Sequence, residues 1–105
     1  MIGFYTSELT KAMNRSPQEK VDFYRAQLES GDREQQRSAA AAIRASYDVR
    51  DQYRRSGQKL VVMIDGNVRH VDPDSPELAD FTPLIPLVKK LFPLAPHEEP
   101  PGFEV

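Results

Sequence analysis

The sequence predicts a single small α+β domain over residues 1–94, followed by a flexible proline-rich tail over 95–105. Three observations predict this class: two helix-starting motifs in the first half, an apolar β-branched run that ends in Asp65-Gly66, and an apolar segment broken by prolines. We therefore expect an N-terminal antiparallel helical pair, then a β-hairpin, then an apolar C-terminal arm.

The first helix is predicted over about 17–30. Ser16-Pro17-Gln18-Glu19 is typical of a helix start, because the serine side chain can accept a free backbone N–H and proline needs no partner there. Gly31 follows at the expected end, since glycine readily adopts the left-handed conformation that closes many helices.

The second helix is predicted over about 33–56. Asp32 and Gln35 repeat the capping pattern, and Gly57 follows the last turn. One face of this helix carries mainly small residues, which favours close packing of the two helices. The residues on that face are Ala39, Ala42, Ile43, Ser46, Val49 and Tyr53.

A hairpin is predicted over about 59–71. Leu60-Val61-Val62-Met63-Ile64 is apolar and largely β-branched, and Asp65-Gly66 favours a two-residue turn with both residues at positive φ. This loop sets the register: Leu60 opposite Val71, Val61 opposite His70, Val62 opposite Arg69, Met63 opposite Val68, and Ile64 opposite Asn67. Because two strands alone are marginal in water, the hairpin must pack on the helices or gain a third strand, for which residues 2–6 are the candidate.

The arm over 76–94 is rich in large apolar residues, whereas the helical pair is poor in them. Leaving such a set in water would cost more than about 10 kcal/mol, so the arm must be covered. A short helix is expected after Ser75, interrupted at Pro83, and another turn or two before Pro93, with Pro86 as a breaker. The arm contains Leu78, Phe81, Leu84, Ile85, Leu87, Val88, Leu91, Phe92 and Leu94.

Two interpretations of the arm stay open: it folds back as ordinary core, or part of it docks on a second chain. A third, contact with a membrane surface, has only Lys89 and Lys90 as basic support.

Composition removes several function classes. The chain has no cysteine, which excludes disulfide scaffolds, Cys-ligated zinc, iron–sulfur clusters and thiol catalysis. A net charge of −2 argues against whole-molecule attraction to polyanions. No signal-peptide pattern and no apolar run of about 20 residues occurs, so we expect a cytoplasmic protein that does not insert into membranes.

Catalytic and metal chemistry find little support. His70, Asp72 and Asp74 alternate and could offer nitrogen and oxygen ligands. Pro73, however, makes a regular strand doubtful there, and the sequence offers no further ligand that would be held in place. The better interpretation of the aspartates is turn and cap chemistry. We predict no catalytic residue, no metal site and no cofactor.

A nucleic-acid surface on the second helix is the alternative function. Arginine favours bidentate contacts with phosphate, but acids three or four residues away on the same helix favour a self-paired, solvated face. The residues of this alternative are Arg33, Arg37, Arg44, Arg54 and Arg55.

The favoured function is that of a non-enzymatic adaptor or assembly subunit. Its partner would be another protein or a second copy of this chain, held by the first strand of the hairpin together with the apolar arm. The expected contact residues are Leu60, Val62, Ile64, Phe81, Leu84, Leu87, Leu91 and Phe92.

Overall fold

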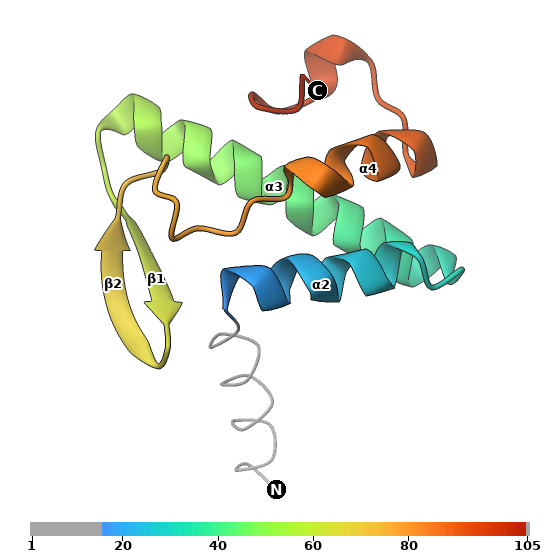
Figure 1. Ribbon diagram of the computed structural model, residues 1–105. Helices are drawn as coiled ribbons and strands as arrows, with labels where there is room; N and C mark the ends of the chain where they lie inside the picture. Colours follow the sequence, from blue (N-terminus) through green and yellow to red (C-terminus); the bar gives the residue numbers. More distant parts are fainter. Residues whose placement is uncertain (1–15, 105) are drawn as a thin grey trace, which may run out of the picture.

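The computed structural model describes residues 16–104 and confirms the α+β class (Figure 1). Two long helices pack as an antiparallel pair and are followed by a hairpin, a short helix and two 3-10 turns. The candidate strand over 2–6 lies outside the described residues. The elements are α2 (Pro17–Leu28), α3 (Arg33–Ser56), β1 (Leu60–Ile64), β2 (Asn67–Val71), η1 (Thr82–Leu84), α4 (Ile85–Leu91) and η2 (Pro96–Glu98).

Helix α2 starts at the predicted cap. The Ser16 side-chain oxygen accepts a hydrogen bond from the backbone N–H of Glu19 at 3.1 Å. The helix ends at Leu28, two residues before the expected end, because Ser30 closes the turn with its hydroxyl bonded to the carbonyl of Gln27 at 2.8 Å. Gly31 then has a φ of 80°, as a tight reversal requires.

Helix α3 has the predicted bounds. Asp32 accepts hydrogen bonds from the backbone N–H groups of Glu34 and Gln35, at 2.9 and 3.3 Å, and so fills the N-terminal cap. Gly57, at a φ of 71°, forms the left-handed C-terminal cap. Local capping chemistry therefore fixes both ends of this helix.

The hairpin has the predicted register along its whole length. Leu60 pairs with Val71 at the open end and Ile64 with Asn67 beside the turn. Asp65 and Gly66 have φ values of 52° and 78°, and two positive values in sequence are what a type I′ turn needs.

The main core cluster lies between α2, α3 and α4, and none of the hairpin side chains that the structure describes belongs to it. Ala39 and Ala40 let α3 approach its neighbours closely, and the only buried apolar side chain described in the hairpin is Val71 at its base. In Figure 1 the hairpin stands to one side of the helices. The buried cluster consists of Val21, Leu28, Ala39, Ala40, Ile43, Ala79, Phe81, Leu84, Ile85, Val88 and Phe103.

The apolar arm packs mainly as core. Its buried residues enter the space above α2 and α3, so for them the ordinary-core interpretation holds. The helix expected after Ser75 is absent from residues 76–81, which form a turn at 76–77 and then an irregular segment. Pro86 does not break α4, because it lies in the first helical turn, where its missing N–H leaves no hydrogen bond unmade.

The segment expected to be a flexible tail packs against the helices in the structure. Residues 96–104 turn back over the helices, and the side chain of Phe103 is completely buried. Its ring meets that of Tyr47 edge-on, with centroids 5.2 Å apart. Burial of one large aromatic ring stabilises the return of a segment that otherwise carries few apolar groups.

Gly102 is required for this return. Its φ is 98°, and a Cβ there would lie 3.0 Å from Cδ1 of Tyr47. We expect Gly102→Ala to lower the free energy of unfolding by about 1–3 kcal/mol, since it combines an unfavourable backbone conformation with overpacking. Gly57→Ala is the matched control: its φ is also positive but open space surrounds it, so the loss measured by urea denaturation should be clearly smaller. Equal losses for the two variants would contradict the steric part of this argument.

Candidate protein-binding surface

The outer face of the hairpin is an exposed apolar surface. We use this name for the face that carries Val61, Met63, Val68 and His70, which alternate along the two strands with the residues of the opposite face. Val61 and Val68 are diagonal neighbours across the two strands and are 60% and 62% exposed. Neighbouring exposed apolar side chains form a patch rather than isolated exposed residues, so this face is a candidate contact surface.

A groove opens at the base of the hairpin, and we call it the hairpin-base groove. It encloses about 460 Å³ between α2, α3, the first residue of β1 and residues 78–81. This volume lies within the range of pockets that hold small groups or side chains. Its main apolar residues are Tyr24, Ala42, Ala45, Val49, Leu60 and Phe81.

The lining of the groove includes small residues of α3. Ala42 and Ala45 end at Cβ and leave room, whereas Tyr24 and Leu60 add larger side chains to the lining. Val49 remains 40% exposed, so the groove is open to solvent. Among the described residues, Lys20 and Arg50 are the charged side chains in its lining, and none of the carboxylates of 16–104 lines it.

Arg50 is positioned by the loop that follows the hairpin. Its Nη2 donates a hydrogen bond to the carbonyl oxygen of Ala79, and its Cζ lies 5.1 Å from the centre of the Tyr47 ring. Burial lowers the pKa of Arg50, and the nearby Tyr47 and Asp80 partly offset this effect. Among the described residues no carboxylate forms an ion pair with this guanidinium.

A polar pocket of about 440 Å³ adjoins the groove and shares Arg50 with it. Its carboxylates are already engaged. Asp80 accepts hydrogen bonds from the hydroxyl and the backbone N–H of Thr82, at 2.6 and 3.0 Å, and these bonds hold its pKa below the usual range. The hydrogen bond from Arg54 likewise lowers the pKa of Asp74.

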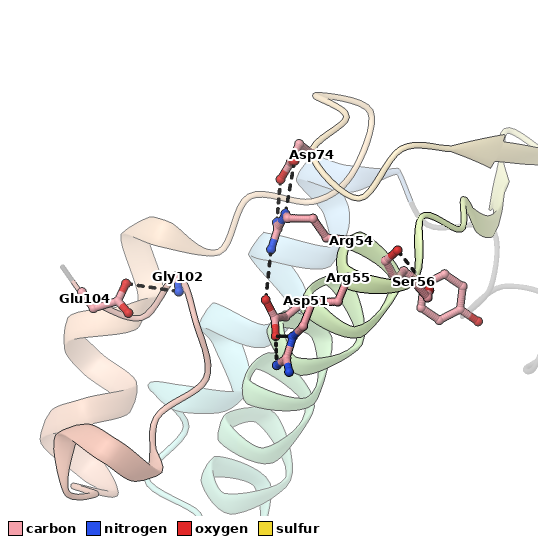
Figure 2. A network of polar contacts seen from close by, with 8 residues as sticks. Asp51, Arg54, Arg55, Ser56, Asp74, Gly102 and Glu104 are labelled. Carbon is pink, nitrogen blue, oxygen red and sulfur yellow. Dashed lines mark hydrogen bonds and ion pairs between the residues drawn. The ribbon is translucent and has the colours of Figure 1, made fainter.

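An ionic network at the end of α3 uses the neighbouring arginines (Figure 2). Arg54 donates to Asp74 at 2.6 Å and lies 3.4 Å from Asp51, and Arg55 also pairs with Asp51. Gly102 donates its backbone N–H to Glu104 at 3.2 Å in the same view. Arg50 is thus the arginine of this region whose charge is not matched by a direct carboxylate contact.

The contact residues expected from the sequence are not all on one surface. Leu60 and Phe81 meet in the hairpin-base groove, although most of the Phe81 side chain lies in the core. Leu84 is buried in the core. Four others are partly exposed, and the side chain of Ile64 lies outside the described part of the structure. The partly exposed residues are Val62, Leu87, Leu91 and Phe92.

Sequence reasoning missed several groove residues. Tyr24 and Val49 belong to the helix faces expected to pack together, but the helices diverge enough there to leave Val49 open. Nothing in the sequence distinguished Arg50 from the other arginines of α3. The apolar spacing of α3 was the available signal, since Val49 continues the small-residue face beyond the buried Ile43.

The arginines of the nucleic-acid alternative are largely engaged within the chain. Arg44 bonds Glu99, Arg33 lies over the Phe92 ring with its Cζ 3.9 Å from the centroid, and Arg54 and Arg55 bond acids. Arg37 is exposed. The expected self-pairing is confirmed at Asp51, so this helix offers phosphates fewer free guanidinium groups than its composition suggests.

The described residues hold no cluster of three or more His, Asp or Glu side chains fit for a metal ion. Within residues 16–104, no helix combines the length and apolarity needed to cross a bilayer. Comparison with protein-family models, curated proteins and solved structures finds no match for this chain.

Proposed function

We propose that this protein is a non-enzymatic protein-binding or assembly subunit. Its contact surface is the outer face of the hairpin together with the hairpin-base groove. The observation that carries the proposal is the position of the apolar hairpin outside the core, with Val61 and Val68 exposed. A cytoplasmic location fits a chain without cysteine.

Energetics support a role for the hairpin in binding. A two-stranded hairpin gains little stability by itself, and this one buries only Val71 among its described apolar side chains. Covering the exposed part of each valine, about three fifths of the side chain, would contribute about 1–2 kcal/mol. A protein partner can supply that cover, and it can also add a strand to an edge, since the described sheet contains only β1 and β2.

Two aspartates on the outer face test this function. We expect the double variant Val61→Asp/Val68→Asp to lose association by at least about tenfold, because charges would have to be buried at the interface. Self-association is measured by size-exclusion chromatography with light scattering over the micromolar range. Association with a different protein is measured by affinity co-purification of the full chain from its native cells.

Leu94→Asp is the matched control, since Leu94 is 42% exposed but lies on the C-terminal segment rather than the hairpin. This variant should keep the association of the unaltered protein. A strictly monomeric protein with no co-purifying partner, or equal loss in the double variant and the control, would rule out the hairpin as the contact surface.

A further inference from the structure

In the part of the chain that the structure describes, the hairpin-base groove combines apolar side chains with charged side chains of one sign. Lys20 from α2 and Arg50 from α3 line it, together with apolar side chains such as Val49. An occupant that matches both features has an apolar body and carboxylates beside it. A purely apolar occupant would leave these cations without counter-charge, and a basic occupant would be repelled.

Arg50 is the stronger of the two cations for recognition. Its side chain is half-buried and held in place by the carbonyl of Ala79 and the ring of Tyr47, so little conformational freedom remains to be lost on binding. One guanidinium has five N–H donors, and Arg50 makes one hydrogen bond with the described residues. A carboxylate of a partner would offset the cost of its burial and use the remaining donors.

We infer that the hairpin-base groove binds an acidic amphipathic segment of a partner protein. An apolar side chain of that segment enters between Tyr24, Val49 and Leu60, and a neighbouring carboxylate pairs with Arg50. The openness of the groove at Val49 favours a peptide, whose backbone can pass along the outside, over a small fatty carboxylate, which needs an enclosed tunnel. This inference rests on the proposed function and names the chemistry of the partner.

The test uses the full chain and a fluorescein-labelled peptide of about four helical turns, with leucine on one face and glutamate flanking it. Fluorescence polarisation should give a dissociation constant in the micromolar range. Replacing every glutamate of the peptide by glutamine should weaken binding by about tenfold or more, and this comparison requires no change to the protein.

Variants of the protein assign the binding to the groove. Arg50→Gln should weaken binding of the acidic peptide by about tenfold and leave the affinity for the glutamine peptide nearly unchanged. Arg54→Gln is the matched control, because Arg54 already bonds Asp74 and does not line the groove; it should change binding by less than about twofold. Val49→Glu, at an exposed position, should weaken binding of both peptides.

Several results would overturn the inference. The first is that the acidic peptide does not bind, and the second is that Arg50→Gln and Arg54→Gln have equal effects. The third is that laurate displaces the labelled peptide at a lower concentration than unlabelled peptide does. Photocross-linking from position 49 to residues 1–15 of the same chain, or to a second copy, would also overturn it by naming a different occupant. If the hairpin variants abolish association while the peptide fails to bind, the proposed function stands and only this inference fails.

Discussion

Replacing Phe103 by alanine is expected to lower the free energy of unfolding by about 3–5 kcal/mol, the usual loss for a fully buried phenylalanine. Its ring packs edge-on against Tyr47 and joins the core cluster, so truncation leaves a cavity between α3 and the C-terminal segment. For a domain whose total stability is of the order of 10 kcal/mol, this is a large fraction. Urea denaturation of the full chain measures the change.

Leu94→Ala is the control for Phe103→Ala. Leu94 belongs to the same C-terminal segment but is 42% exposed, so its truncation should cost less than about 1 kcal/mol. Hydrogen exchange should also show faster exchange in residues 96–104 of the Phe103 variant. Similar stabilities for the two variants would mean that the C-terminal segment does not hold the core together.

Arg44→Gln is expected to destabilise the protein by about 3–5 kcal/mol at neutral pH, because it leaves a carboxylate unpaired where little solvent reaches it. Arg44 bonds both carboxylate oxygens of Glu99, at 2.8 and 2.9 Å, and donates to the carbonyl of Phe92 at 2.7 Å. The two side chains are only 14% and 9% exposed. Chemical denaturation by urea gives the loss.

A second substitution separates charge pairing from packing. Adding Glu99→Gln to Arg44→Gln should recover part of the lost stability, since the unpaired buried charge is then removed. Arg69→Gln is the exposed control: both partners of its ion pair with Glu77 are open to solvent, at 48% and 37% exposed, and its loss should cost less than about 1 kcal/mol. A loss from Arg44→Gln no larger than this would show that the pair with Glu99 contributes little.

The parts of the fold that follow from neighbouring residues were predicted well. Ser16 and Asp32 cap their helices through atoms two or three residues away, and Asp65-Gly66 sets the hairpin register by its own backbone angles. The end of α2 was misplaced by two residues because Ser30 and Glu29 compete with the helix for the last carbonyls.

The candidate site was predicted only in outline. The β-branched strand over 60–64 and residues 78–94 of the apolar arm were expected to form one contact surface, and Leu60 and Phe81 from these segments both line the hairpin-base groove. Whether a given apolar residue of the arm faces the core or the solvent depends on packing between elements distant in sequence. For that reason Leu84 and Phe81 could not be assigned to the core in advance. For the same reason Val49 and Arg50 were not recognised as residues of the hairpin-base groove.

The amino-acid sequence alone determined the fold class, the helix caps and the pairing of the strands, because hydrogen bonding and backbone sterics between near neighbours decide them. The tertiary structure decided the return of the C-terminal segment, the pairing of Arg44 with Glu99 and the unmatched charge of Arg50. These features join residues tens of positions apart, and the stability of each contact depends on burial that arises only once the helices have packed.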